Sequence, residues 1–209
     1  MKLQGSKARQ YLLLIALVAF GALLITTAAT GNQEVQVLPK AKQTSLGLYV
    51  TAKEAYKKWI AAPDAVKIFD VRTLEEYVYI GHAPMAWNIP LMSQTHEWDA
   101  DKGYFAMQPN PDFVSLVKEV AGPIDTVLVM CRSGGRSAIA VNMLAEAGFT
   151  NVYNITDGME GDVIKDPESV FKGQRLKNGW KNSGVPWTYK IEPYRVRLVN
   201  RKKVAADSE

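Results

Sequence analysis

Residues 126–148 read TVLVMCRSGGRSAIAVNMLAEAG and contain the features that decide the fold. The first five residues are apolar or β-branched without a break, which is typical of a strand buried in a parallel sheet. The loop CRSGGR, residues 131–136, follows directly. Residues 137–147 then have the composition of a helix with an apolar face, and Gly148 ends it. A buried strand, a short loop and a helix in this order indicate an α/β protein.

The rest of the chain alternates strands and helices in the same way. Thr51 and Glu54 have the spacing of a capping box at the start of a helix over residues 52–61. Together with residues 126–148, the whole pattern predicts an α/β domain with a central parallel sheet flanked by helices. We expect a further helix at 112–120, a short helix or turn at 73–79, strands at 66–71, 86–89 and 151–155, and inserted loops at 93–111 and 162–181.

The first 31 residues differ in composition from the others. Three basic residues precede an almost unbroken apolar run at 11–29, which is typical of a secretory signal. The run is also long enough to span a bilayer, so an uncleaved membrane anchor is an alternative. Both place the later residues in an extracytoplasmic, periplasmic compartment. We therefore expect a signal peptide or N-terminal membrane anchor at 1–31, a linker at 32–45, one domain at 46–190 and a solvated basic tail at 191–209.

Composition excludes several classes of function. The chain has 209 residues and a formal net charge of +4, and the three basic residues within 1–31 leave only +1 for the remainder. A nearly neutral domain gives no support for nucleic-acid binding. One Cys excludes an intramolecular disulfide and a multi-Cys metal site, and two His leave little for a His-rich site or a Ser–His–Asp triad. We expect no metal and no cofactor, and chemistry that depends on the lone Cys131.

Cys131 stands where α/β proteins bind their ligands, beyond the carboxyl end of a strand. Gly134 and Gly135 allow a tight turn with inward N–H groups, and the following helix adds free N–H groups and the positive end of its dipole. With Arg132 and Arg136, this predicts an anion cradle that favours the nucleophilic thiolate. A buried structural Cys fits less well, because an arginine and two glycines follow it.

A thiolate in an anion cradle serves two chemistries, phosphoryl transfer and sulfur transfer. Cys-dependent phosphatases use a C-x5-R loop that surrounds a phosphate, whereas Cys131 and Arg136 have C-x4-R spacing. The shorter loop favours a sulfane sulfur on the Cys over a tetrahedral phosphate. The loop length and the lack of a second Cys also argue against an arsenate reductase.

Two motifs in the expected order resemble the rhodanese (thiosulfate sulfurtransferase) family. One is the loop Cys131–Ser137, and the other reads Asp70-Val71-Arg72, Glu75-Glu76-Tyr77, Gly81-His82-Ala83-Pro84 and Asn88-Ile89-Pro90-Leu91. The resemblance covers residues 46–187 and implies a three-layer α/β fold. It also implies a sulfurtransferase that takes sulfane sulfur from thiosulfate or a polysulfide and passes it to cyanide or a thiol.

The resemblance implies roles for the residues of both motifs. Cys131 is expected to be the nucleophile and to carry the sulfur as a persulfide. Arg132 is expected to bind the sulfonate end of thiosulfate. Arg136 is expected to be an anion ligand or a brace of the loop. Asp70, Arg72 and His82 are expected to be structural residues near the site. The residues expected to bind substrate, in part through their backbone N–H groups, are Arg132, Ser133, Gly134, Gly135, Arg136 and Ser137.

The sequence also departs from the family pattern. Met85 replaces the usual Gly of the second motif, and the insertions at 93–111 and 162–181 are longer than in a minimal member. Asp157 and Glu160 are expected at the rim of the cleft. The aromatic residues of the insertions either cover the site and select the acceptor or serve as packing; they are Trp98, Tyr104, Phe105, Phe171 and Trp180.

A non-catalytic member of the same family is the alternative function. Such a module would bind a sulfur carrier or another partner protein without transferring sulfur. The presence of Cys131 and of both loop glycines favours the enzyme. The N-terminal segment adds a possible membrane attachment to either function.

Overall fold

A computed structural model describes residues 38–198. The predicted signal peptide or anchor, residues 32–37 of the predicted linker and the end of the basic tail lie outside the described residues and stay predictions. Within 38–198, no helix has the length and apolar character needed to cross a membrane.

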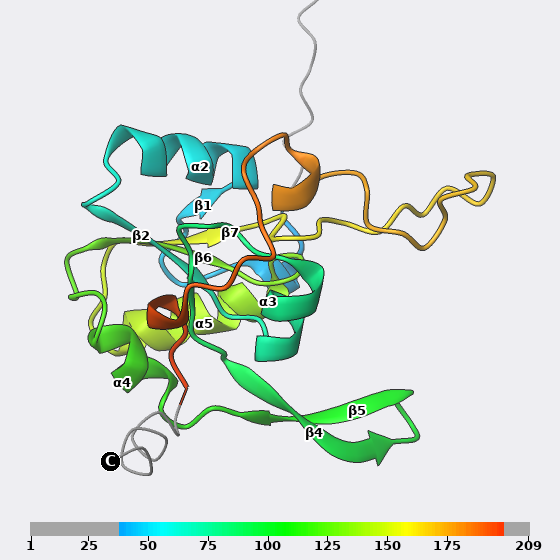
Figure 1. Ribbon diagram of the computed structural model, residues 1–209, viewed down its shortest axis with the longest axis horizontal. Helices are drawn as coiled ribbons and strands as arrows, with labels where there is room; N and C mark the ends of the chain where they lie inside the picture. Colours follow the sequence, from blue (N-terminus) through cyan, green and yellow to red (C-terminus); the bar gives the residue numbers. More distant parts are fainter. Residues whose placement is uncertain (1–37, 199–209) are drawn as a thin grey trace, which may run out of the picture. The chain divides into compact units, whose positions relative to one another are not determined.

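Five parallel strands form the central sheet, in the order β1-β7-β6-β2-β3 (Figure 1). The central pair, β6 and β2, is in register over five residues, from Val66 opposite Thr126 to Asp70 opposite Met130. The four strands expected from the sequence are confirmed, and β1 is an additional strand of two residues. The bounds are β1 Tyr49–Val50, β2 Val66–Asp70, β3 Trp87–Asn88, β6 Thr126–Met130 and β7 Val152–Ile155.

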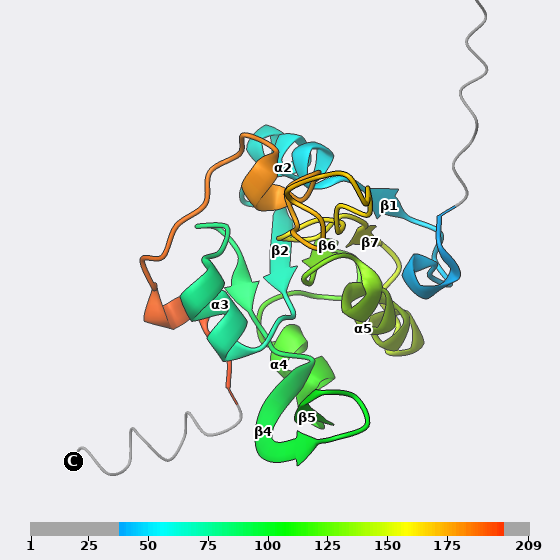
Figure 2. The ribbon, with the colours of Figure 1, turned by 90° about the vertical axis from the view of Figure 1, so that its right-hand side faces the viewer.

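Helices cover both faces of this sheet, which confirms the three-layer α/β fold (Figures 1 and 2). Successive strand residues point to opposite faces, so Phe69 and Val129 pack with α4 and α5, whereas Ile68 and Leu128 pack with α2. The described helices are α2 Ala52–Ala61, α3 Leu74–Ile80, α4 Phe113–Lys118 and α5 Gly135–Glu146, with short 3₁₀ turns η1 Lys40–Lys42, η2 Trp180–Asn182 and η3 Pro193–Arg195.

Two capping boxes fix where helices begin. Thr51 accepts a hydrogen bond from the backbone N–H of Glu54, and the Glu54 carboxylate accepts one from the N–H of Thr51, as the sequence predicts. Thr73 and Glu76 form the same reciprocal pair at α3. Each pair satisfies two N–H groups that a helix end leaves unpaired. The segment expected to be a short helix or turn at 73–79 is therefore a helix.

The prediction of a loop at 93–111 is wrong, because this insertion is a β-hairpin. Strands β4 (Met92–Asp99) and β5 (Tyr104–Pro109) pair antiparallel and project from the domain at its lower edge in Figures 1 and 2. No residue of either strand is buried. Strand signals in a sequence come mainly from a buried apolar face with period two, and this hairpin has none.

The second insertion, 162–181, contains one core residue and an exposed loop. Trp180 is fully buried and lies edge-on to Tyr56 of α2, with 5.9 Å between ring centroids. Packing is therefore the role of Trp180. Phe171 is half exposed on the projecting loop.

The start of the predicted basic tail is part of the packed domain. Val196 is buried and forms a bridge with Asn88 of β3. The Arg195 guanidinium donates to the carbonyl of Met85 at 2.8 Å and stacks on the Trp87 ring. The expectation of a solvated tail is therefore wrong for these residues, since their apolar and arginine side chains cover the edge strand of the sheet.

Candidate active site

Cys131 follows β6, a central strand, and is almost fully buried at 2% exposure. The backbone N–H of Gly134 donates to its Sγ at 3.2 Å. The Ser137 hydroxyl lies 3.4 Å from the same sulfur. Gly134 directly precedes α5, where backbone N–H groups are free, whereas the single hydroxyl proton of Ser137 is donated to Asn154. This arrangement stabilises negative charge on the sulfur.

Asn154 of β7 holds the loop in place, a contact that local sequence reasoning missed. Its Oδ1 accepts from the Ser137 hydroxyl at 2.6 Å, and its Nδ2 donates to the carbonyls of Gly134 at 3.0 Å and Lys42 at 2.9 Å. Asn154 is fully buried. The available signal was a polar residue inside an otherwise apolar strand, because a buried amide needs partners.

The loop also rests on the segment after β7. The carbonyl of Cys131 accepts from Met159 N–H at 2.8 Å, and the carbonyl of Arg132 accepts from Glu160 N–H at 2.9 Å. Asp157 is buried rather than at the rim of a cleft. Its carboxylate accepts from the N–H groups of Ala52 and Gly179, and burial raises its pKa despite these bonds.

Arg136 is a brace between α5 and α3. Its guanidinium makes two hydrogen bonds with the Glu76 carboxylate, at 2.6 and 2.7 Å. Burial alone would raise the pKa of Glu76, but the contact with Arg136 outweighs burial and holds that pKa below its ordinary value. The paired arginine has little charge left for a substrate anion, so the brace is the role that the geometry supports.

Asp70 and Arg72 form a fully buried ion pair at the end of β2. The guanidinium binds both carboxylate oxygens and donates to the carbonyl of Gly81 at 2.8 Å. Burial would lower the pKa of Arg72, and the carboxylate of Asp70 reverses that effect and raises it. Asn88 donates to the carbonyls of both residues. The pair fixes the turn after β2, which agrees with a structural role.

His82 lies between two carbonyl groups. Its Nδ1 is 3.1 Å from the carbonyl oxygen of Tyr77, and its Nε2 is 3.2 Å from that of Lys190. The ring stacks on Tyr77 with 3.7 Å between centroids. Burial lowers the pKa of His82, so the neutral ring is favoured. These contacts describe a structural histidine.

The remaining loop residues differ in exposure. Arg132 is exposed, and its side chain forms no hydrogen bond or ion pair within the part of the chain that the structure describes. Ser133 is half-buried. Gly135 begins α5, and only Gly134 of the two glycines has a positive φ, 97°. A free cation next to Cys131 is what an anionic substrate requires.

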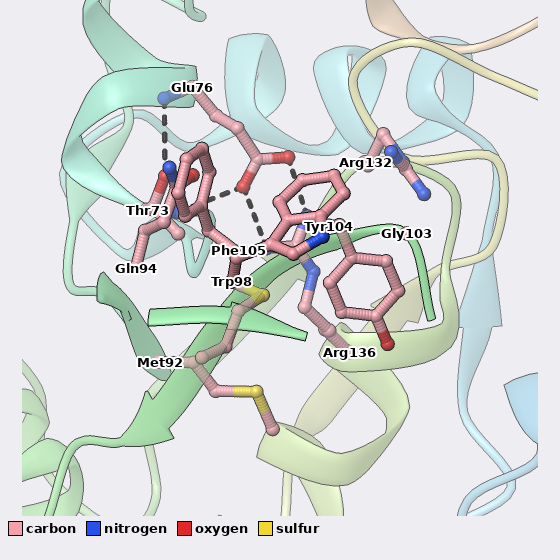
Figure 3. Close-up of a pocket in the computed structure, with 11 residues that line it drawn as sticks. Thr73, Glu76, Met92, Gln94, Trp98, Gly103, Tyr104, Phe105, Arg132 and Arg136 are labelled. Atoms are coloured by element: carbon pink, nitrogen blue, oxygen red, sulfur yellow. Dashed lines mark hydrogen bonds and ion pairs between the residues drawn. The ribbon is translucent and has the colours of Figure 1, made fainter. Parts of the chain in front are cut away.

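A cavity of about 710 Å³ lies between this loop and the hairpin (Figure 3). Arg132, Arg136, Thr73 and Glu76 line one part of it. Cys131 does not line the cavity, although its loop does. The hairpin residues that line it are Met92, Gln94, Trp98, Gly103, Tyr104, Phe105 and Met107. Within residues 38–198, no group of three or more His, Cys, Asp or Glu is arranged to hold a metal ion.

Comparisons with known proteins agree with this geometry. The rhodanese-like domain model matches residues 52–164. An uncharacterized protein of Rickettsia prowazekii is 31% identical over 145 residues, which covers 67% of this chain and 96% of the relative. Thiosulfate sulfurtransferase 16, chloroplastic, of Arabidopsis thaliana is 41% identical over 92 residues, 44% of this chain and 69% of that protein.

A solved structure supports the fold. The crystal structure of Rv0390 from M. tuberculosis is 26% identical, has a TM-score of 0.53, and covers 68% of this chain and 96% of its own. The match of the family model over more than half of the chain and the relative that is 31% identical and matched over 96% of its length lead to one conclusion. The chain belongs to the rhodanese-like domain family.

Proposed function

We propose that this protein is a sulfurtransferase that moves a sulfane sulfur through a persulfide on Cys131. The observation that carries the proposal is the Gly134 N–H that donates to the Cys131 sulfur, at the start of α5, with the Ser137 oxygen 3.4 Å from the same sulfur. Free Arg132 beside them supplies the charge that attracts an anionic sulfur donor. Family membership and the similarity to a thiosulfate sulfurtransferase support the same chemistry.

The proposed reaction has two steps. The Cys131 thiolate attacks the outer sulfur of thiosulfate, the S–S bond of thiosulfate breaks, and sulfite leaves with the bonding electron pair. Cyanide or a thiolate then attacks the outer sulfur of the persulfide, and Cys131 leaves as the thiolate. A polysulfide serves as donor in the same way. No external oxidant or reductant is consumed.

Backbone donors are well suited to this reaction. The attacking Cys131 sulfur carries negative charge as the thiolate, and the outer sulfur carries the charge in the persulfide. A fixed N–H group stabilises both without reorganisation, because the loop is anchored by Asn154 and by the Arg136–Glu76 pair. An attacking thiolate needs no general base, and both ring nitrogens of His82 face the carbonyls of Tyr77 and Lys190 instead.

The test is the intact mass of the purified chain after exposure to thiosulfate. We expect a gain of one sulfur atom, its loss on addition of cyanide, and formation of thiocyanate. Cys131→Ser abolishes all three if the persulfide forms on Cys131. A wild-type chain that gains no sulfur and makes no thiocyanate would refute the enzyme and favour the non-catalytic module.

We further propose that the chain is exported and acts in an extracytoplasmic compartment. The support is the basic residues at positions 2, 7 and 9 followed by the apolar run 11–29. Fractionation of cells tests the compartment. The mass of the recovered protein distinguishes a cleaved signal peptide from a retained anchor.

A further inference from the structure

The hairpin presents one face to the Cys131 loop. Residues 92, 94 and 98 of β4 and residues 105 and 107 of β5 line the same cavity, although the pairing of the two strands shifts register between Gln94 and Trp98. Trp98 and Phe105 are opposite each other in the register, and their rings meet edge to face at 5.3 Å. Figure 3 shows these side chains around one cavity with Arg132 and Arg136.

This cavity is much larger than the proposed inorganic substrates. Its volume of about 710 Å³ lies in the range of sites that bind small organic molecules. Thiosulfate and cyanide would fill only a small part and have no apolar surface for the rings. Trp98, Tyr104 and Phe105 are 59%, 51% and 43% exposed, so they have apolar area available to a ligand.

The charges at the cavity indicate an anion. Glu76 neutralises Arg136 through two hydrogen bonds, and the other lining residues apart from Arg132 are uncharged. Arg132 therefore leaves one positive charge without a partner among the described residues. A ligand that fits has an apolar body for the hairpin and one carboxylate for Arg132.

We propose that the hairpin and Arg132 form the subsite for the sulfur acceptor, a small organic thiol with an apolar ring or chain and a carboxylate. This rests on the proposed sulfurtransferase function and names its acceptor class. The buried position of Cys131 favours a slender thiol over a residue on a folded protein surface. In the transfer, the acceptor thiolate attacks the outer sulfur of the Cys131 persulfide. The new bond makes the acceptor persulfide, and Cys131 leaves as the thiolate.

The experiment separates the two half-reactions. Purified chain is loaded with thiosulfate, freed of donor, and checked by mass for one added sulfur. Discharge of the sulfur is then timed with cyanide and with four thiols: mercaptoethanol, mercaptopropionate, phenylmethanethiol and para-mercaptomethylbenzoate. The last carries both ring and carboxylate, and we expect it to have the highest second-order rate constant.

Variants assign the preference to the subsite. For each protein, the rate constant of a ring thiol is divided by that of cyanide. Trp98→Ala lowers this ratio about three- to tenfold for both ring thiols, because the loss of one aromatic contact has that effect on a rate. Arg132→Gln lowers the ratio of para-mercaptomethylbenzoate to phenylmethanethiol. Tyr79→Ala is the matched control, because Tyr79 is an exposed aromatic outside the cavity, and it leaves all ratios unchanged.

The possible failures are distinguishable. If no sulfur is loaded on Cys131, the sulfurtransferase function itself is wrong. If sulfur is loaded and cyanide removes it, but ring thiols have no advantage or Trp98→Ala acts no differently from Tyr79→Ala, the acceptor subsite is wrong and the function stands.

Discussion

Replacing Gly134 with alanine tests whether the geometry of the Cys131 loop controls both stability and reactivity. Gly134 has φ = 97°, and a Cβ there would stand 2.2 Å from the carbonyl oxygen of Thr156. Gly148, just after α5, has φ = 94° and open space around its Cβ position. Gly148→Ala therefore introduces the same backbone strain without the collision, which makes it a matched control.

The structure gives the expected magnitudes. An L-residue in the left-handed region costs about 1–2 kcal/mol, and both variants incur this. The collision with Thr156 adds about 1–3 kcal/mol for Gly134→Ala alone, as for other overpacked sites. Relief of the collision moves the Gly134 N–H away from the Cys131 sulfur. A hydrogen bond to a charged group is worth about 1.5–3 kcal/mol, so sulfur loading slows roughly 10- to 150-fold.

Two measurements check these values. Urea unfolding of the wild type and both variants gives the free energies of unfolding. The rate of mass gain with thiosulfate, measured without urea where all three proteins are folded, gives the rate of sulfur loading. Equal stabilities for the two variants would contradict the collision. A Gly134→Ala protein that loads sulfur at the wild-type rate would refute the role of this N–H group.

Three further substitutions have defined outcomes. Asp70→Ala leaves Arg72 buried without its carboxylate, and urea unfolding is expected to show a loss of about 3–5 kcal/mol; a loss near zero contradicts the buried pair. The pKa of His82 is lowered from 6.5, so the unfolded chain binds the proton first and stability declines as the pH falls below that value. His82→Gln should flatten this decline in urea midpoints between about pH 8 and pH 5, and an unchanged slope would exclude His82 as its source. Ser137→Ala leaves the buried Oδ1 of Asn154 without a donor and so weakens the anchor of the Cys131 loop, and thiosulfate loading should slow about tenfold; a wild-type rate would exclude this anchor as a control of reactivity.

The sequence by itself determined the local units of this protein. The unbroken apolar run 126–130, the Thr51–Glu54 capping box and the CRSGGRS loop each lie within a few residues, and each has the structure that its pattern predicts. Strand, loop and helix in succession also determine the three-layer fold, because parallel strands need crossover helices. Cys131 could therefore be placed at the carboxyl end of a strand without coordinates.

Only the tertiary structure decided which distant groups meet around that Cys. Arg136 pairs with Glu76, sixty positions earlier, and Asn154 reaches Gly134 because β7 lies beside β6. Strand order sets these contacts, and no local pattern encodes it. The hairpin at 92–109 shows the same limit, since its pairing buries no residue and leaves no periodic signal. The cavity that the hairpin forms with Arg132 and Arg136 follows from long-range packing that acts on the whole chain at once.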